Sequence, residues 1–418
     1  MKLAVIADTH LGYKYGSERG EDAFTNTADA FQKAVESHPD AIILLGDIFD
    51  HKIEKPEVLG RAMQLFQKLN SKCPNVIAIY GTHETRHKDA TNPVQLLAQA
   101  KLLTLLHKNS IRLDKDNQKV VIHELSGVHD SFAKDELAGW SPQPTLDAYN
   151  IILLHQTFKE DIPPLTNVMT YADLPAGFDL FLFGHIHHQH ESTNPLILYP
   201  GSTVRTQLGR NTPRKLGFYV LEITNNQLTK KEFVHLDAPR DFVHLKLDVS
   251  NNTPAEIITA LDNKLTNIAA TKTFSNKKPL IKIKLTGQLQ KGFSASDLHL
   301  TSTAKKFKEC GHLKIDKSKI ESEHSKERLK FLADLGQKQE SIESLGIDLL
   351  ARKLKDTNIP KPKLAELFEK LSAGDLEASE ALLSNQKKEK PAEDKPVASN
   401  VIKEKPVSSA SWQDTFDI

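Results

Sequence analysis

In the first half of the chain, short apolar runs end directly at an aspartate or a histidine. Leu3–Ala7 leads into Asp8, and Ala41–Leu45 leads through one glycine into Asp47. Uninterrupted apolar runs of this length are typical of strands that are buried on both faces of a parallel sheet. The carboxyl ends of parallel strands share one edge of the sheet, where loops converge on a crevice. The pattern therefore predicts a polar site at that edge.

The segments between these strands carry apolar residues at helical spacing, as at Phe24, Phe31 and Val35, and a third apolar run follows at Val76–Tyr80. This alternation predicts a βαβαβ unit with right-handed crossovers and a largely parallel sheet. A helix is expected next, at Pro93–Leu106. Further strand-like runs lie at Lys119–His123, Asn150–Leu154, Asp179–Phe183, Leu196–Tyr199 and Gly217–Ile223. We expect a four-layer α/β sandwich built on two facing sheets.

From about Arg240 the sequence changes character and predicts a small α+β domain. Thr253, Pro254 and Glu256 are typical of a capped helix start, and the helix is expected to run to about Ile268. The other elements expected here are strands at Phe242–Val249, Leu280–Leu285 (half-exposed) and His312–Ile315, and a helix at about Ser296–Cys310. The predicted domains are residues 1–236, 237–316 and 317–385, followed by a tail at 386–418.

The last two regions lack a core of their own. Residues 317–385 carry two short amphipathic stripes, one around Leu345 and one around Leu367, with prolines between them. Two such helices cannot bury both stripes alone, so we expect them to dock on another surface. Residues 386–418 contain few apolar residues and are predicted to be disordered. The tip of the tail is a candidate partner-binding peptide, through Trp412, Phe416 and Ile418.

Composition narrows the class of protein. The net charge of +1 gives no global basic field of the kind that indicates nucleic-acid binding. The two cysteines, Cys73 and Cys310, lie far apart, which argues against a thiolate metal site or a disulfide framework. No apolar run approaches the ~18–20 residues that a membrane span needs. We expect a cytoplasmic protein that does not contact a membrane.

Further histidines follow later strand-like runs: His155 follows one, and His185 and His187 follow another. Residues two apart in an extended chain point the same way, so Asp8 and His10 can present two ligands to one site. Imidazole and carboxylate ligands without thiolate suit manganese, iron or zinc. Two such ions, ~3.5–4 Å apart, can clamp the attacking and leaving oxygens of a phosphoester displacement. The sequence therefore predicts a two-metal phosphoesterase centre that Asp47 can bridge.

The alternative to this prediction is a purely structural role for these residues. The chain has 18 histidines, so chance pairs arise easily, and a single histidine at a strand end is more often structural than a ligand. Six positions in a fixed order, each at a strand end, favour the site instead. The histidines that lack this placement are interpreted as surface or core residues: His38, His51, His87, His107, His123 and His129.

The motifs resemble the calcineurin-like metallophosphoesterase signature. They are Asp8-Thr9-His10, Gly46-Asp47, Gly81-Thr82-His83-Glu84, His155 and Gly184-His185-Ile186-His187. Flanking residues resemble DNA-repair nucleases of the SbcD type and their archaeal and eukaryotic meiotic-recombination relatives; these are Leu11-Gly12-Tyr13, Ile48-Phe49-Asp50 and Tyr199-Pro200-Gly201-Ser202. The resemblance implies a metallophosphoesterase nuclease core at 1–236, a DNA-capping domain at 237–316 and an ATPase-binding helix pair within 317–385.

Carried over position by position, the resemblance implies two Mn²⁺ ions per subunit. One would be held by Asp8, His10, Asp47 and His187, and the other by Asp47, Thr82, His155 and His185. His83 would act on the leaving group as a proton donor or by stabilising charge. Most relatives have Asn at the position of Thr82, which predicts looser binding of the second metal, with Glu84 compensating through water. Asp50 stands where some relatives have His, so the balance of exonuclease and endonuclease activity is open.

The function implied by the resemblance is a manganese-dependent DNA nuclease for double-strand-break ends, with 3'-5' double-strand exonuclease and single-strand endonuclease activity. Its implied partners are double-stranded DNA ends, an SMC-like coiled-coil ABC ATPase and a second copy of the chain. The alternatives are a small-molecule phosphodiesterase of the same fold and a DNA-end-binding scaffold with weakened catalysis. Candidate phosphate contacts lie on loops at the predicted rim: Tyr13, Lys14, Lys52, Lys55, Arg86, Lys88, Arg205, Arg210 and Arg214.

Overall fold

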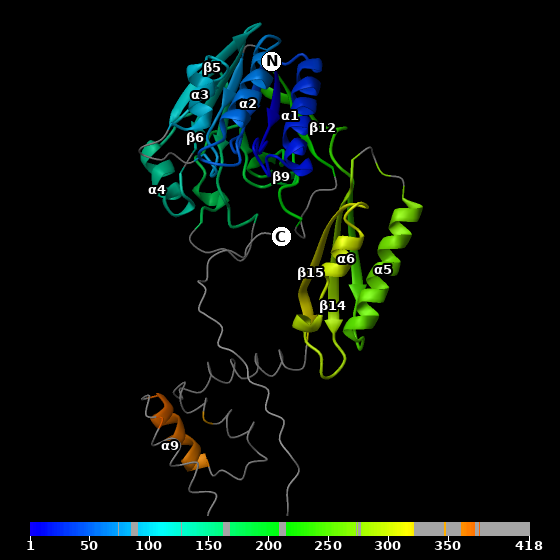
Figure 1. Cartoon of the computed structure of the whole chain (residues 1–418). Coiled ribbons are helices and arrows are strands. Elements are labelled where there is room, and N and C mark those ends of the chain that lie inside the picture. Colours follow the sequence, from blue (N-terminus) through cyan, green and yellow to red (C-terminus); the bar gives the residue numbers. More distant parts are fainter. Residues whose placement is uncertain are drawn as a thin grey trace, which may run out of the picture. The chain divides into compact units, whose positions relative to one another are not determined.

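A computed structural model of the chain describes residues 1–73, 75–84, 91–126, 128–161, 168–208, 215–272, 274, 277–321, 347, 361–372 and 376. The chain divides into two compact units, Met1–Glu323 and His324–Ile418. Figure 1 shows the helices and strands of both.

The first sheet of unit Met1–Glu323 has six strands in the order β12-β11-β1-β2-β3-β4. Their bounds are Lys2–Ile6 for β1, Ala41–Leu44 for β2, Val76–Ala78 for β3, Thr104–Leu105 for β4, Gly217–Thr224 for β11 and Gln227–His235 for β12. Strands β1 to β4 are parallel, and β11 pairs antiparallel with β1, so the sheet is mixed. The first strand of the chain thus lies in the middle of its sheet.

The second sheet also has six strands, in the order β5-β6-β7-β8-β10-β9. Their bounds are Asn109–Lys115 for β5, Gln118–Leu125 for β6, Tyr149–Leu154 for β7, Leu180–Phe183 for β8, His190–Thr193 for β9 and Leu196–Tyr199 for β10. The four central strands are parallel, while the edge strands β5 and β9 are antiparallel to their neighbours. This sheet is therefore mixed as well.

Apolar side chains hold the two sheets and the helices together. Val5 and Ile43 of the first sheet share a core with Ile122 of the second. The opposite face of the first sheet packs against α1 (Glu18–Glu36), α2 (Pro56–Asn70) and α3 (Pro93–Gln99). There the rings of Phe31 and Phe66 meet edge to face at 5.3 Å. The second sheet is covered by α4 (Asp130–Trp140), which completes the expected α/β sandwich. We call this sandwich the core domain.

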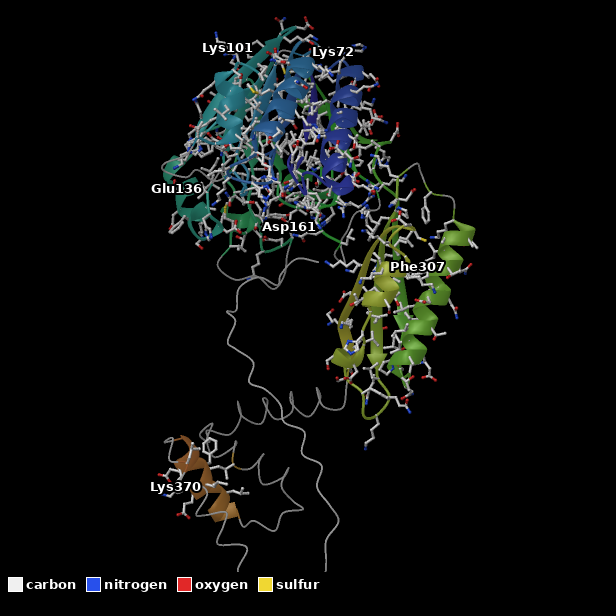
Figure 2. All side chains as sticks on the ribbon, viewed as in Figure 1. Lys72, Lys101, Glu136, Asp161, Phe307 and Lys370 are labelled. Carbon is white, nitrogen blue, oxygen red and sulfur yellow. The ribbon has the colours of Figure 1, made fainter. Side chains whose placement is uncertain are left out.

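Residues 242–321 form a β-α-β-α-β module. Its three parallel strands are β13 (Phe242–Asp248), β14 (Leu280–Gln288) and β15 (His312–Glu321), and its helices are α5 (Pro254–Thr271) and α6 (Thr301–Lys306). Helix α5 begins with the expected capping box, in which Thr253 and Glu256 bond each other's backbone N–H groups. Phe307, labelled in Figure 2, is buried between the helices and the sheet.

Several element boundaries differ from the sequence-based expectation. The helix expected at Pro93–Leu106 ends at Gln99, because Thr104 and Leu105 pair with β3 as a short strand. The helix expected at about 296–310 is confined to α6. Strand β14 is not half-exposed, since it is the central strand of its sheet and Lys282 is buried. Helix α4 and the edge strands β5, β9 and β12 were not expected at all.

Of unit His324–Ile418, the structure describes Ile347, Leu376 and helix α9 (Lys361–Ser372). Helix α9 confirms the helical stripe expected around Leu367. The stripe around Leu345 and the tail at 386–418 lie outside the described residues, so the helix pair stays a prediction. No helix in the described part of the chain is long and apolar enough to cross a membrane.

Candidate metal centre

The backbone turns sharply where the central strands end. Asp8, His10, Asp47 and His185 have positive φ angles of 50°, 43°, 45° and 78°. Residues other than glycine rarely adopt this region, and each instance costs on the order of 1–3 kcal/mol and tends to mark a functional site. Gly81 lets the loops approach closely, because a Cβ there would lie 2.1 Å from Asp47 Oδ1. The strand ends thus hold the candidate ligands in a conformation that the chain alone does not favour.

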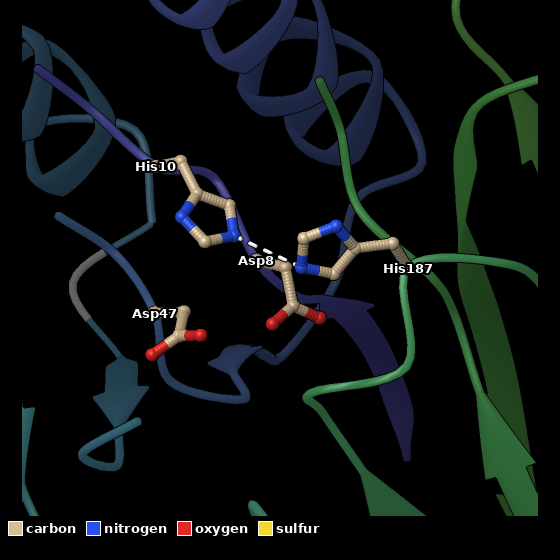
Figure 3. Close-up of side chains that lie close together, drawn as sticks. All are labelled: Asp8, His10, Asp47 and His187. Carbon is tan, nitrogen blue, oxygen red and sulfur yellow. Dashed lines mark hydrogen bonds between the residues drawn. The ribbon is translucent and has the colours of Figure 1, made fainter. Parts of the chain in front are cut away.

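The first group of candidate ligands is Asp8, His10, Asp47 and His187 (Figure 3). One ligand atom from each lies within 4.8 Å of those of the others. The Nε2 atoms of His10 and His187 face each other at 3.1 Å. Asp8 Oδ2 is buried without a hydrogen-bond partner. Two imidazole nitrogens and an unpartnered carboxylate oxygen that converge in this way suit a divalent cation.

The second group is Asp47, His155 and His185, so Asp47 belongs to both groups. His155 Nε2 lies 3.2 Å from Asp47 Oδ2 and 3.9 Å from Asp8 Oδ1 but makes no hydrogen bond. The other ring nitrogen, Nδ1, donates to the Leu45 carbonyl at 2.6 Å. Such a backbone bond orients a metal-binding histidine with Nε2 toward the ion. The donor set therefore fits two cations, with Asp47 available to both.

The loop after β3 reaches the same carboxylate. Thr82 Oγ1 donates to Asp47 Oδ2 at 3.3 Å, and the His83 backbone N–H donates to Asp47 Oδ1 at 2.8 Å. The His83 ring is exposed at the edge of the site, and its Nδ1 donates to the Asp50 carbonyl at 2.6 Å. This bond leaves His83 Nε2 as the ring nitrogen that is available to contact a substrate. All eight positions singled out by sequence are thus close together.

Asp50 is a site residue whose contacts sequence did not reveal. Its Oδ1 lies 3.1 Å from His10 Nδ1, and it forms a third compact group with His10 and His83. The loops after β1 and β2 lie side by side, as the Leu11–Phe49 bridge shows, and this brings Asp50 to His10. The spacing of three residues from Asp47 was the signal available in the sequence. Asp50 orients His10 with its Nε2 toward the first group.

The electrostatics of the site also favour bound cations. Burial raises the pKa of Asp8 to about 7. Burial alone would lower the pKa of His155, but Asp47 and Asp8 raise it to about 10. Burial lowers the pKa of His185 to about 4 and that of His187 to about 3, so both rings are neutral at pH 7, as metal ligands must be. The field that draws a proton to His155 also attracts a metal ion.

Glu84 has a different role from the one expected. Its carboxylate is fully buried and accepts hydrogen bonds from the Phe49 N–H at 2.7 Å and the Gly81 N–H at 2.9 Å. Burial, together with Asp47, raises its pKa to about 8. Glu84 therefore ties the Asp47 loop to the Gly81 loop rather than facing the second metal position through water.

The expected phosphate contacts at the rim divide into three sets. Lys14, Lys52 and Lys55 are exposed, as expected. Tyr13 and Arg205 are buried and bond the backbone at Thr206 and Arg240, so the expectation is wrong for both. Arg86, Lys88, Arg210 and Arg214 lie outside the described residues. Of the histidines interpreted as non-ligands, those that the structure describes stand outside the three groups: His38, His51, His107, His123 and His129.

Comparison with known proteins identifies relatives of the chain. Residues 1–226 match the calcineurin-like phosphoesterase superfamily domain. The chain is 28% identical to the DNA double-strand break repair protein Mre11 of Methanopyrus kandleri over 58% of each chain. It is 25% identical to Mre11 of Sulfolobus acidocaldarius, covering 69% of this chain and 75% of the relative. It is 25% identical to a subunit of the nuclease SbcCD of Staphylococcus epidermidis, covering 68% of this chain and 82% of the relative.

The sequence matches cover only part of each relative. The chain spans 58% of the Methanopyrus protein and 51% of an Mre11 protein from Archaeoglobus fulgidus, little more than half the length of either. A dimetal phosphatase from Danio rerio matches with a TM-score of 0.35 and 13% identity over 56% of this chain and 98% of that one. The family assignment rests on the domain match and the sequence relatives. The chain belongs to the calcineurin-like phosphoesterase superfamily, in which its sequence relatives are proteins of the Mre11/SbcD family.

Proposed function

We propose that the chain is a manganese-dependent DNA nuclease that processes double-strand-break ends in the cytoplasm. It would combine 3'-5' double-strand exonuclease activity with single-strand endonuclease activity. The observation that carries the proposal is the pair of ligand groups that share Asp47. DNA is proposed as the substrate because the sequence relatives include a nuclease subunit and DNA double-strand break repair proteins.

In the proposed centre, Asp8, His10, Asp47 and His187 would hold one Mn²⁺, and Asp47, Thr82, His155 and His185 would hold the other. When bound, the two cations would lower the pKa of a water molecule and neutralise negative charge on the phosphate. The chain keeps the ligands oriented through the bonds of His155 to Leu45 and of His10 to Asp50. His83, exposed at the edge, stabilises the leaving oxygen or gives it a proton.

The test is Mn²⁺-dependent cleavage of linear duplex DNA. His83→Ala should abolish cleavage while leaving Mn²⁺ and DNA binding intact. The control is His38→Asn, an exposed histidine before β2 at the opposite edge of the sheet. Asn tolerates the positive φ of that position. Loss of metal binding in His83→Ala would contradict the assigned role, and DNA binding without cleavage in the unmodified protein would favour the scaffold alternative.

The module supports a DNA-capping role through the face of its sheet that carries no helix. Apolar side chains of the three strands alternate toward α5 and α6. The opposite face carries cross-strand rows of His244, Lys282 and Lys314, and of Lys246, Lys284 and Asp316, of which Lys282 is buried. An excess of lysine over carboxylate on one face suits the phosphate backbone of DNA.

A charge reversal tests this face. Lys246 and Lys314 are exposed, and Lys246→Glu with Lys314→Glu should weaken duplex DNA binding and reduce its salt dependence. Lys305→Glu, an exposed lysine on α6 at the helix-covered side, is the matched control. Equal affinities for the two variants would contradict a DNA contact on this face, while cleavage assays would still test the nuclease proposal.

The proposed partner of the helical region is an SMC-like coiled-coil ATPase. Helix α9 is amphipathic, and residues ~340–385 of which it is part are the proposed docking segment. Deletion of 338–385 should abolish ATPase binding in a pull-down but leave Mn²⁺-dependent nuclease activity. Retained ATPase binding would refute the assignment. The proposed homodimer is checked separately, by the molar mass in solution.

A further inference from the structure

Arg240 joins the module to the core domain through one buried side chain. It lies in the connection between β12 and β13, and its Nε donates to both carboxylate oxygens of Asp22 on α1, at 2.8 and 2.7 Å. Its Nη2 donates to the Glu18 carbonyl at 2.9 Å, and its Nη1 donates to the Lys278 carbonyl, just before β14, at 2.9 Å. Arg240 thus fastens the start of α1 to two segments that enter the module.

Arg205 continues this contact toward the metal centre. It lies in the loop between β10 and β11, and its Nη1 donates to the Arg240 carbonyl at 2.8 Å. The Arg205 guanidinium lies 5.9 Å from the ring centre of Phe242, the first residue of β13. The Arg205 carbonyl accepts a bond from Arg19, which is itself 3.4 Å from Asp22. Asp22, Arg205 and Arg240 are buried, and we call these three residues the buried clamp.

The next residue along the chain, Thr206, contacts a candidate metal ligand. Its Oγ1 lies 3.1 Å from Nδ1 of His187. Its carbonyl accepts a bond from the Tyr13 hydroxyl at 2.8 Å. A hydroxyl oxygen that accepts from Nδ1–H keeps the imidazole in the tautomer whose Nε2 binds a metal. One peptide bond therefore separates the buried clamp from the group that orients His187.

We infer that Thr206 is a positioning residue for His187 and that the buried clamp holds Thr206 in place. Docking of the module on α1 then sets the geometry of one metal position. The inference rests on the proposed function only in that His187 binds a metal ion. It requires no change in the chemistry of the site, because neither Thr206 nor the clamp touches a substrate.

Mn²⁺ titration of the metal-free protein, followed by electron paramagnetic resonance, tests Thr206 without an activity assay. Thr206→Val keeps the shape but removes the hydroxyl, and it should lower the affinity of one of two Mn²⁺ sites by about 10-fold to 100-fold. Thr206→Ser keeps the hydroxyl and should retain the affinity of the unmodified protein. Equal affinities for the Val and Ser variants would overturn the inference.

The clamp is tested by Arg240→Lys, which keeps the charge but cannot reproduce the three-way contact. We expect the affinity of the same Mn²⁺ site to fall by about 10-fold. The control is Arg61→Lys, because Arg61 makes a two-bond ion pair with Glu21 on the surface of α1, at 2.8 and 2.7 Å. The double variant Thr206→Val/Arg240→Lys should bind no more weakly than Thr206→Val alone, since both changes break one path.

Each outcome separates the inference from the proposed function. The role of the clamp would be overturned if the losses of Mn²⁺ affinity in the two single variants added up fully in the double variant. Normal Mn²⁺ binding by a folded Arg240→Lys protein would overturn it as well. Circular dichroism checks that each variant folds. If Arg240→Lys does not fold, the comparison of Thr206→Val with Thr206→Ser still tests the role of Thr206. Two Mn²⁺ sites without DNA cleavage would refute the nuclease and leave the inference standing.

Discussion

Thr82 is the position in the proposed centre that supplies neither a carboxylate nor an imidazole. Its Oγ1 donates to Asp47 Oδ2 at 3.3 Å, so it lies beside the carboxylate that both ligand groups share. A hydroxyl is shorter than the amide of Asn and is a poorer neutral ligand. Glu84, engaged with two backbone N–H groups, does not replace it. We therefore expect the second metal position to bind more weakly than the first.

We predict that Thr82→Asn raises the affinity of the second Mn²⁺ site, because the amide oxygen extends further toward His155 and His185. Calorimetric titration of both proteins with Mn²⁺ measures the two sites separately. Thr82→Ser serves as the control, since it keeps a short hydroxyl. Equal second-site affinities for the Asn variant and the unmodified protein would contradict the prediction.

Most of the site could be predicted from the sequence, because ligand residues must follow strand ends and strand ends are marked by apolar runs. Asp8, Asp47 and His155 were found in this way. The contact of Asp50 with His10 could not be, since it depends on which two loops lie side by side. The burial of Arg205 also escaped prediction, because a loop arginine is normally exposed.

Strand β6 carries a buried carboxyl group, one residue before its end, that lies outside the three ligand groups. Glu124 is fully buried, and its Oε2 accepts a bond from the Lys108 N–H at 2.9 Å, just before β5. Its other oxygen has no hydrogen-bond partner. Burial raises the pKa of Glu124 from 4.5 to about 8. The end of this strand therefore holds a proton at neutral pH in the folded protein.

This proton makes stability depend on pH. Below pH 4.5 Glu124 is protonated in both states, and between 4.5 and about 8 only the unfolded chain ionises. The free energy of unfolding should therefore fall as pH rises through this window, by at most about 1.4 kcal/mol per unit, and level off above it. Glu124→Gln should remove this contribution. Urea unfolding from pH 5 to 9 in the presence of a chelator measures it, and parallel profiles for the two proteins would contradict the prediction.

Elements with strong periodicity or caps were predicted well, and short or polar ones were not. The capping box at Thr253 fixed the start of α5, and the central strands carried continuous apolar runs. By contrast, β12 is an edge strand whose middle is three consecutive charged residues, Lys230, Lys231 and Glu232, so its sequence shows no strand pattern. Its extended conformation comes from antiparallel pairing with β11. Helix α3 was predicted too long, because the pairing of Thr104 and Leu105 with β3 overrides helical spacing.

At the scale of the whole molecule, the metal centre should contribute to folding stability. The carboxylates of Asp8 and Asp47 are buried, and the backbone at both residues has a positive φ angle. Bound cations would offset the free-energy cost of burying these charges. We predict that Mn²⁺ raises Tm and that a chelator lowers it. One site contributes about 2.7 kcal/mol at a metal concentration 100 times its Kd. Differential scanning calorimetry measures the shift, which Asp47→Asn should largely abolish; an unchanged Tm in the unmodified protein would contradict the prediction.

Strand β1 lies between β2 and β11 in the first sheet, and the Met1 amino group donates to the Ile223 carbonyl at 2.7 Å. During synthesis, β1 and β2 leave the ribosome long before β11 does. Pairing between strands so distant in sequence forms slowly. Until β11 is made, the edge of β1 is unpaired and its backbone groups can pair with strands of other chains. Translation speed and chaperone binding across residues 7–216 should therefore decide how much of the newly made protein reaches its native form.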